Sequence, residues 1–365
     1  MKRSTSKVNN NLLRDVVICI IIFTALISLA TFLLHNTESR SFEETKEDPV
    51  PQANTAPIET TPVSTISNPV TSAIFSAWLW DSPDSFSKED LVKIFEISKK
   101  ENISTIYLRM DDYADIYEMK NSTEKVRRIE ALDTAAENFI VLASKYGIKV
   151  EALGGNTTWA EPENLFYPNL FFDGVIKYNA SHPHAQFVGI QFDVESNNSP
   201  SYKLNKQKAL LEYLDFVEDM IDKKPKSDFL IGFAIPFFYS VEGNSEGKID
   251  WNGRGSKLVA YHMFDLLNET EGGYVAYMNY RNLAEGVYGS INKAQDIFNY
   301  VSKNNHQVKI VIGQETDNVS PARITFHGKS KTYFKTEVAK LISAFLQYPQ
   351  FAGIAIHHLQ SYIDL

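Results

Sequence analysis

Two carboxylates, Asp193 and Glu195, are the residues of this sequence best placed to do acid–base chemistry. They lie in the segment FVGIQFDVES, residues 187–196, which has the composition of a β-strand. Because side chains alternate across a strand, the two acids share one face with Gly189 and Gln191 and stand about 7 Å apart, while the other face is wholly apolar. Such a pair is costly at the end of a buried strand and is typical of a catalytic site, although solvated strand-end acids would give the same pattern.

The elements that must position these acids alternate between strand and helix from residue 73 to residue 365. Apolar strand candidates lie near residues 74–80, 104–110, 148–153, 187–193, 229–235, 273–279, 308–313 and 351–356. Amphipathic helical stretches lie near residues 87–101, 124–146, 203–223, 255–268, 290–303 and 331–347. The pattern predicts an α/β fold, a (β/α)8 TIM barrel without a full eighth helix. An open doubly wound sheet is the alternative, but no glycine-rich phosphate loop follows the first strand.

Polar and aromatic side chains follow almost every strand candidate. The carboxyl ends of barrel strands face one common mouth, so residues distant in sequence meet there. Aromatic rings stack on sugar rings, while carboxylate, amide and guanidinium groups bind hydroxyls, so this set predicts a sugar site. The candidate substrate-binding residues are Trp78, Trp80, Asp111, Asn156, Trp159, Tyr239, Arg281, Asp317 and His357. Packing within the barrel wall is the alternative role for each tryptophan.

Four of these segments resemble motifs of the family 18 chitinases. Residues 147–155, GIKVEALGG, are similar to the Gly-Gly segment of that family's third strand. Residues 193–195, Asp-Val-Glu, resemble the end of the strand-four motif Asp-x-x-Asp-x-Asp-x-Glu. Residues 278–280, Met-Asn-Tyr, resemble the strand-six motif Met-x-Tyr, and residues 353–357 lie where the family has a glycine-rich eighth strand ending in tryptophan.

The resemblance implies a catalytic role for three residues. Glu195 would be the general acid, Asp193 would orient the substrate's N-acetyl group, and Tyr280 would bond the carbonyl oxygen of that group. Enzymes of that family retain configuration and use the substrate's own acetamido oxygen as nucleophile, an exception to the two-carboxylate rule. The sequence departs from the family pattern at Val188, Gln191, Arg281 and His357.

Glu315, at the end of the seventh strand candidate, supports a second interpretation. Retaining barrel glycosidases with acids on strands four and seven place them about 5–5.5 Å apart as acid/base and nucleophile. Glu195 and Glu315 fit those positions, although Val194 stands where such enzymes usually have asparagine. Glu315 could instead bind substrate or pair with Arg281. A non-catalytic carbohydrate-binding barrel is a third hypothesis, because such barrels can lose the acid.

Other catalytic chemistries find little support in the sequence. His357 and His358 are adjacent and would point to opposite faces of a strand, so no metal site is predicted. A Gly-x-Ser-x-Gly elbow, which a serine hydrolase of the α/β class would need, is absent. We expect no cofactor. The hypothesis that remains is a glycoside hydrolase acting on a polysaccharide or oligosaccharide.

The first 72 residues predict attachment to a membrane. Residues 1–15 form a basic tail, and residues 16–34 run without a charged side chain and contain the only cysteine, Cys19. A run of that length is about long enough to span a bilayer, and the basic flank predicts a cytoplasmic N-terminus with the barrel outside. Residues 35–72 are rich in Pro, Thr and Ser and predict a disordered tether. The net charge of −9 gives no basic surface for nucleic acid.

Overall fold

Eight parallel strands close into a barrel in the computed structural model, which describes residues 75–243 and 247–365. The strands are β1 (Phe75–Leu79), β2 (Ile103–Arg109), β3 (Lys149–Gly154), β4 (Gly189–Phe192), β5 (Leu230–Pro236), β8 (Gly273–Met278), β9 (Lys309–Glu315) and β10 (Phe351–His357). They follow one another around the barrel in chain order, and β10 pairs with β1. The predicted (β/α)8 barrel is therefore confirmed, and the doubly wound alternative is wrong.

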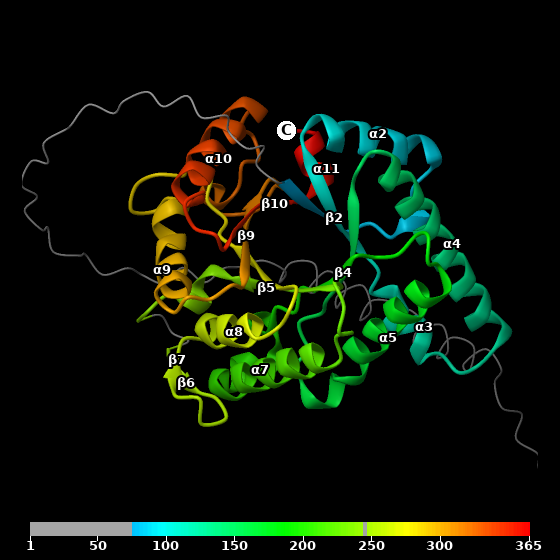
Figure 1. Cartoon of the computed structure of the whole chain (residues 1–365), viewed down its shortest axis with the longest axis horizontal. Helices are drawn as coiled ribbons and strands as arrows, with labels where there is room; N and C mark the ends of the chain where they lie inside the picture. The colour runs from blue at the N-terminus through cyan, green and yellow to red at the C-terminus, as the bar shows by residue number, and fades with distance from the viewer. Residues whose placement is uncertain (1–74, 244–246) are drawn as a thin grey trace, which may run out of the picture. The chain divides into compact units, whose positions relative to one another are not determined.

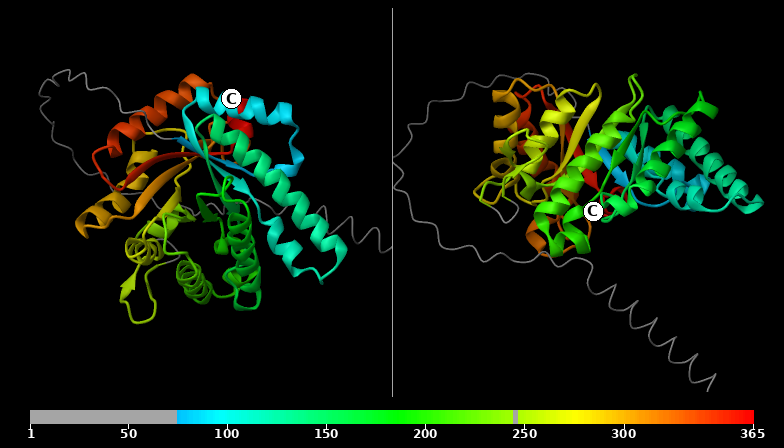
Figure 2. Two further views of the ribbon diagram at one scale, coloured as in Figure 1. Left: turned by 45° about the vertical axis from the view of Figure 1, so that its right-hand side comes forward. Right: turned by 90° about the horizontal axis from the view of Figure 1, so that it is seen from below.

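Helices surround the strands in all three views (Figures 1 and 2). The helices are α2 (Lys88–Lys100), α3 (Asp112–Glu118), α4 (Thr123–Lys145), α5 (Phe166–Ser181), α6 (Pro200–Leu204), α7 (Lys206–Asp222), α8 (Val259–Asn268), α9 (Ser290–Lys303), α10 (Lys331–Phe345) and α11 (Leu359–Ile363). A short hairpin, β6 (Ile249–Asp250) and β7 (Ser256–Lys257), precedes α8. No helix within the described residues is long and apolar enough to cross a bilayer, and the span predicted at residues 16–34 lies outside them.

The alternation of side chains along β4 separates the barrel interior from the layer between strands and helices, as predicted. Phe192 points outward, where its ring lies 5.7 Å from that of Phe171 in α5 and 5.5 Å from that of Phe216 in α7. Gln191 points inward and is fully buried inside the barrel. The apolar face of this strand therefore packs against helices, while its polar face belongs to the barrel interior.

Three local predictions need correction. The strand β4 ends at Phe192, so Asp193 and Glu195 follow it in a turn instead of extending it. The helix predicted over residues 203–223 is broken at Asn205, because the Asn205 side chain accepts a hydrogen bond from Lys208 N at 3.1 Å and begins α7 there. The helices α3 and α5 lie outside the helical stretches predicted from the sequence.

The last helix, α11, has only five residues, and polar contacts hold it in place. The hydroxyl of Tyr362 donates a hydrogen bond to Glu101 Oε2 at 2.9 Å. The same carboxylate pairs with Lys335 of α10 at 2.7 Å. Glu101 follows the last residue of α2, so these contacts join the C-terminus to helices on both sides. The barrel closes in this way without a full eighth helix.

A chain of four buried polar side chains crosses the barrel interior. Trp78 Nε1 donates to Gln191 Oε1 at 2.5 Å, and Gln191 Nε2 donates to the Tyr274 hydroxyl at 2.8 Å. That hydroxyl donates in turn to Glu151 Oε2 at 2.7 Å. Gly232 gives the tyrosine its space, because a Cβ there would lie 2.1 Å from the ring. Each hydrogen bond satisfies a group that would otherwise be buried without a partner.

Burial raises the pKa of Glu151 to about 7, although the hydrogen bond from Tyr274 offsets part of the effect. The folded barrel therefore holds a proton on Glu151 that the unfolded chain releases above its ordinary pKa of 4.5. This proton stabilises the fold fully below that pKa, and the contribution is lost as the pH rises toward 7.

We predict that Glu151→Gln makes the unfolding free energy less dependent on pH between 4.5 and 7. Glutamine keeps the acceptor for Tyr274 and removes the ionisation, so the variant should match or exceed the parent chain at pH 7.5. Urea unfolding at several pH values measures this, with Glu96→Gln on the exposed face of α2 as control. An unchanged pH slope would contradict the prediction.

Candidate active site

Asp193 and Glu195 lie at the carboxyl end of β4, in a turn where both acids are half-buried. The Asp193 amide donates to Gly154 O at 3.0 Å, which continues the pairing with β3 for one residue. The chain then turns, and Asn198 N donates to Glu195 O at 2.9 Å. The Glu195 side chain is half-buried, and its Oε2 accepts a hydrogen bond from Asn198 Nδ2 at 3.0 Å.

The carboxyl of Asp193 is held where its charge is poorly solvated. Its Oδ1 is buried, and no described residue donates a hydrogen bond to it. Burial raises the pKa of Asp193 well above its ordinary value, and the negative charge of Glu195 raises it further. Protonation of His357 would act in the opposite direction, because its positive charge would favour the ionised form of Asp193. The pair Asp193–Glu195 therefore keeps one proton near neutral pH, which is what a proton-donating site needs.

His357, the last residue of β10, contacts side chains at the ends of three other strands, β1, β8 and β9. Its Nδ1 lies 2.9 Å from Glu315 Oε2, and the indole Nε1 of Trp80 lies 3.1 Å from its Nε2. Because an indole N–H can only donate, Nε2 accepts and Nδ1 carries the proton donated to Glu315. The imidazole also lies 5.7 Å from the ring of Trp78 and 5.8 Å from that of Tyr280. His357 and these aromatic rings form a floor beside the acid pair.

Glu315 is committed to hydrogen bonds within the protein. It is only 3% exposed, its Oε1 accepts from Asp317 N at 2.7 Å, and its Oε2 is bonded to His357. The hydrogen bond from the imidazole stands where pairing with Arg281 was one alternative for Glu315. This geometry suits a residue that orients His357, because each carboxylate oxygen is held by a hydrogen bond within the protein.

Tyr280 and Arg281 continue the mouth after β8. The Arg281 Nη1 donates to Tyr280 O at 2.6 Å, and the guanidinium lies 4.6 Å above the ring of Phe237. Both side chains are half-buried, so each keeps a surface toward solvent. Asp317 is also half-buried, with its Oδ2 3.6 Å from His358 Nε2.

Two predicted residues after β2 and β3 lie at the neighbouring edge of the mouth. Asp111 accepts a hydrogen bond from Arg109 Nε at 2.7 Å. Burial raises the pKa of Asp111, and Arg109 offsets part of that rise. Asn156 is exposed on the loop after β3 and lines a pocket together with Trp159.

Two aromatic residues predicted to bind substrate are enclosed by the protein. Tyr239 is 1% exposed and packs edge-on against Tyr213 of α7, with ring centroids 5.9 Å apart. Trp78 is also 1% exposed, and its N–H is used by Gln191 inside the barrel. For Trp78 the packing alternative fits the structure better than direct contact with a substrate, and Tyr239 is enclosed in the same way. Trp78 still contributes to the floor indirectly, because its ring packs against that of His357.

The structure adds residues that the sequence did not suggest. Three of them, Gln191, Tyr274 and Glu151, are linked to the floor through Trp78. The signal that could have found them is a single polar residue within an apolar strand candidate. Asp115 and Tyr167 line the pocket with Asn156, but they come from two helices whose bounds were not predicted. Among the residues described, no group of three or more His, Cys, Asp or Glu side chains is arranged to hold a metal ion.

Comparison with known proteins identifies no family for the chain. No protein-family model matches the sequence, and no curated protein sequence matches it. Similar solved structures include the exo-β-1,4-mannosidase Op5Man5 from Opitutaceae bacterium strain TAV5, with 8% identity and a TM-score of 0.47 over 78% of this chain. This chain spans 51% of that mannosidase chain.

Two further similar structures are covered almost completely by this chain. A chitinase from Bacteroides thetaiotaomicron has 16% identity and a TM-score of 0.46 over 79% of this chain and 90% of its own. The PgaB (BpsB) glycoside hydrolase domain from Bordetella bronchiseptica has 11% identity and a TM-score of 0.47 over 80% and 95%. All three TM-scores are below 0.5, too low to transfer an activity or a substrate to this chain.

We predict that Glu195→Gln lowers the pKa of Asp193. The substitution removes the neighbouring negative charge that disfavours ionisation of Asp193, while the burial of Asp193 remains. Carboxyl carbon chemical shifts followed through a pH titration measure this pKa, with the exposed Glu89→Gln as a matched control. A pKa of Asp193 that is the same in the parent chain and in Glu195→Gln would show that the two acids are not coupled.

Proposed function

We propose that this chain is a glycoside hydrolase in which Glu195 is the proton donor. The observation that carries the proposal is the coupling of two half-buried carboxyls, Asp193 and Glu195, at the carboxyl end of a barrel strand. Coupling to Asp193 keeps a proton on the pair near neutral pH, and in the proposed reaction Glu195 carries it. A proton held there can be given to the leaving glycosidic oxygen.

The surroundings of the acid pair suit a sugar ring. Trp80 and Tyr280 offer half-buried aromatic rings on either side of His357, and Arg281 offers hydrogen-bond donors beside them. An aromatic surface binds the C–H face of a pyranose, and the polar groups bind its hydroxyls. These features support a polysaccharide or oligosaccharide as substrate.

The hydrogen bonds that Glu315 accepts within the protein favour a substrate-assisted reaction over the two-carboxylate reaction. A carboxylate nucleophile needs an oxygen that faces the anomeric carbon, but both oxygens of Glu315 accept hydrogen bonds within the protein. The chemistry implied by the resemblance to family 18 needs no second carboxylate, because the N-acetyl oxygen of the substrate attacks. Asp193 would orient that group, with Tyr280 bonding its carbonyl oxygen. A covalent glycosyl adduct trapped on Glu315 would instead establish the two-carboxylate route.

A carbohydrate-binding barrel without activity is the second candidate function. The aromatic floor around His357 would serve a binder equally well. Asp193 argues against this function, because a buried carboxyl with an unbonded oxygen destabilises the fold and adds nothing to simple binding. Strained or costly groups of this kind are retained where chemistry uses them.

We further propose that the barrel is attached to a membrane and lies outside the cytoplasm. The uncharged run at residues 16–34 and the basic residues before it support this orientation. The Pro-rich residues 35–72 would then separate the barrel from the bilayer, where a polymer substrate is accessible.

We predict that Glu195→Gln lowers kcat by about 100-fold or more on the cleaved polysaccharide, because general acid catalysis typically contributes about 10²–10⁴-fold. The glutamine keeps the size of the side chain, so binding and thermal unfolding should change little. Release of reducing sugar measures the effect, and the exposed Glu163→Gln serves as control. Full turnover by Glu195→Gln would exclude Glu195 as proton donor.

We predict that protease added to intact cells removes a tag fused after Leu365. An exported barrel leaves the tag outside, whereas a cytoplasmic enzyme used as control should remain intact. Immunoblotting before and after lysis measures both. A tag that becomes sensitive only after lysis would place the barrel in the cytoplasm and refute the orientation.

A further inference from the structure

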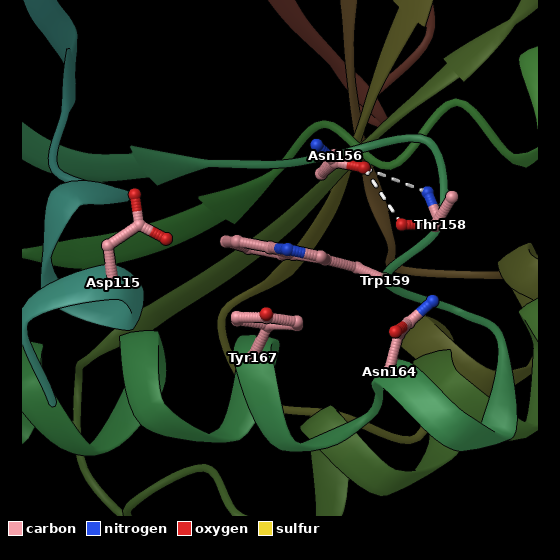
Figure 3. A pocket seen from close by; sticks show the side chains of 6 residues that line it. All are labelled: Asp115, Asn156, Thr158, Trp159, Asn164 and Tyr167. Atoms are coloured by element: carbon pink, nitrogen blue, oxygen red, sulfur yellow. Dashed lines mark hydrogen bonds between the residues drawn. The ribbon is translucent and has the colours of Figure 1, made fainter. Parts of the chain in front are cut away.

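A pocket lies between α3 and the segment that joins β3 to α5, and the proposed reaction makes no use of it. Its volume is about 360 Å³, within the range of about 300–1,000 Å³ that is usual for small-ligand sites. The residues that line it are Asp115, Asn156, Thr158, Trp159, Asn164 and Tyr167. Figure 3 shows Trp159 and Tyr167 one above the other, with Asp115 coming from the facing helix.

The aromatic side of the pocket is fixed by packing. The indole of Trp159 is 6% exposed and lies against Phe171, with ring centroids 5.8 Å apart. The ring of Tyr167 lies against that of the exposed Phe166, with centroids 4.0 Å apart and the planes tilted by 33°. Rings held in this way keep their position when the pocket is empty, which lowers the entropy that a ligand must overcome.

Hydrogen bonds also fix the polar side of the pocket. Asn156 Oδ1 accepts from Thr158 N at 3.1 Å and from Thr158 Oγ1 at 3.0 Å, as the dashed lines in Figure 3 mark. Asn164 Nδ2 donates to Glu161 Oε2 at 3.1 Å. Amide and hydroxyl groups on one side and aromatic rings on the other make the pocket suitable for a sugar unit.

The charge around the pocket is negative. Asp115 is exposed, and none of the six lining residues is a lysine or an arginine. Burial raises the pKa of Tyr167, and the negative charges of Glu118 and Asp115 raise it further. Arg109, the last residue of β2, has its guanidinium paired with Asp111 at 2.7 Å and with Asp112 at 3.5 Å. An anionic sugar would be repelled here, and an ammonium group would be attracted.

The loop that lines the pocket packs against the backbone of Asp193. Gly155 packs so tightly against the backbone of Asp193 that a Cβ at Gly155 would lie 1.9 Å from the Asp193 carbonyl oxygen. The next residue, Asn156, already lines the pocket. A sugar chain whose bond is cleaved at Glu195 can therefore extend along this edge of the mouth.

We propose that this pocket is a distal subsite that binds a cationic amino-sugar unit of the substrate chain, with the ammonium group at Asp115 and the sugar between the aromatic rings and Asn156. The proposal names the class of sugar that this pocket binds. It rests on the proposed function only for the position of the cleaved bond. It predicts that a glucosamine oligomer binds more tightly than an uncharged oligomer of the same length, and that an oligogalacturonate binds most weakly.

The test is calorimetric titration of the full chain carrying Glu195→Gln, with and without Asp115→Asn. The ligands are hexamers of glucosamine, N-acetylglucosamine and galacturonic acid. Removing one exposed carboxylate should weaken binding of the glucosamine hexamer about two- to fivefold at low salt, which corresponds to about 0.4–1 kcal/mol and lies within the range of an exposed ion pair. The N-acetylglucosamine hexamer should lose less than twofold, and high salt should abolish the difference.

The exposed Glu163→Gln is the matched control, because it removes one negative charge from the same loop without lining the pocket. It should leave all three affinities unchanged. Equal affinity for the glucosamine hexamer with and without Asp115, or no binding of that hexamer, would overturn the subsite. Turnover retained by Glu195→Gln would overturn the proposed function instead, so the two failures are distinguishable.

Discussion

The mouth of this barrel depends on the closure of the sheet between its first and last strands. β1 and β10 pair in parallel with Ala77 opposite Ile356, and this register brings Trp80 within hydrogen-bond distance of His357, 277 residues away. The pairing of β10 with β9 places His357 opposite Glu315, whose carboxylate fixes the imidazole. A shift by one residue in either pairing would turn these side chains to the opposite face and remove the floor beside Asp193.

Burial raises the pKa of two acids, Glu151 and Asp193, in two different settings. Glu151 lies in the barrel interior with a tyrosine donor, and its raised pKa keeps it neutral as part of the packing. Asp193 lies at the mouth with an unbonded Oδ1 and a second carboxylate two residues away. The first acid therefore contributes to structure, whereas the second, in the proposed reaction, shares a proton with Glu195.

Periodicity in the sequence was enough to predict the eight strands, most helices and the strand end that carries Asp193 and Glu195. It did not reveal that β4 stops at Phe192, since the turn depends on backbone hydrogen bonds beyond Val194. Periodicity also could not show which aromatic residues lie at the mouth and which pack in the core. Tyr239 follows a strand as Trp80 does, but the helical turn after β5 returns it to the core. The bond between Glu315 and His357 requires the register of two strands, which no local pattern encodes.

The central claim is that the acid pair breaks glycosidic bonds, and product analysis in ¹⁸O-labelled water tests it most directly. The full chain would be incubated with a panel of polysaccharides and the soluble products weighed by mass spectrometry. The account predicts shorter oligosaccharides from at least one polymer, each with a single ¹⁸O at its new reducing end, because hydrolysis adds one water per bond cleaved. Tight binding of a polymer with no released product would contradict the account and identify the barrel as a carbohydrate binder.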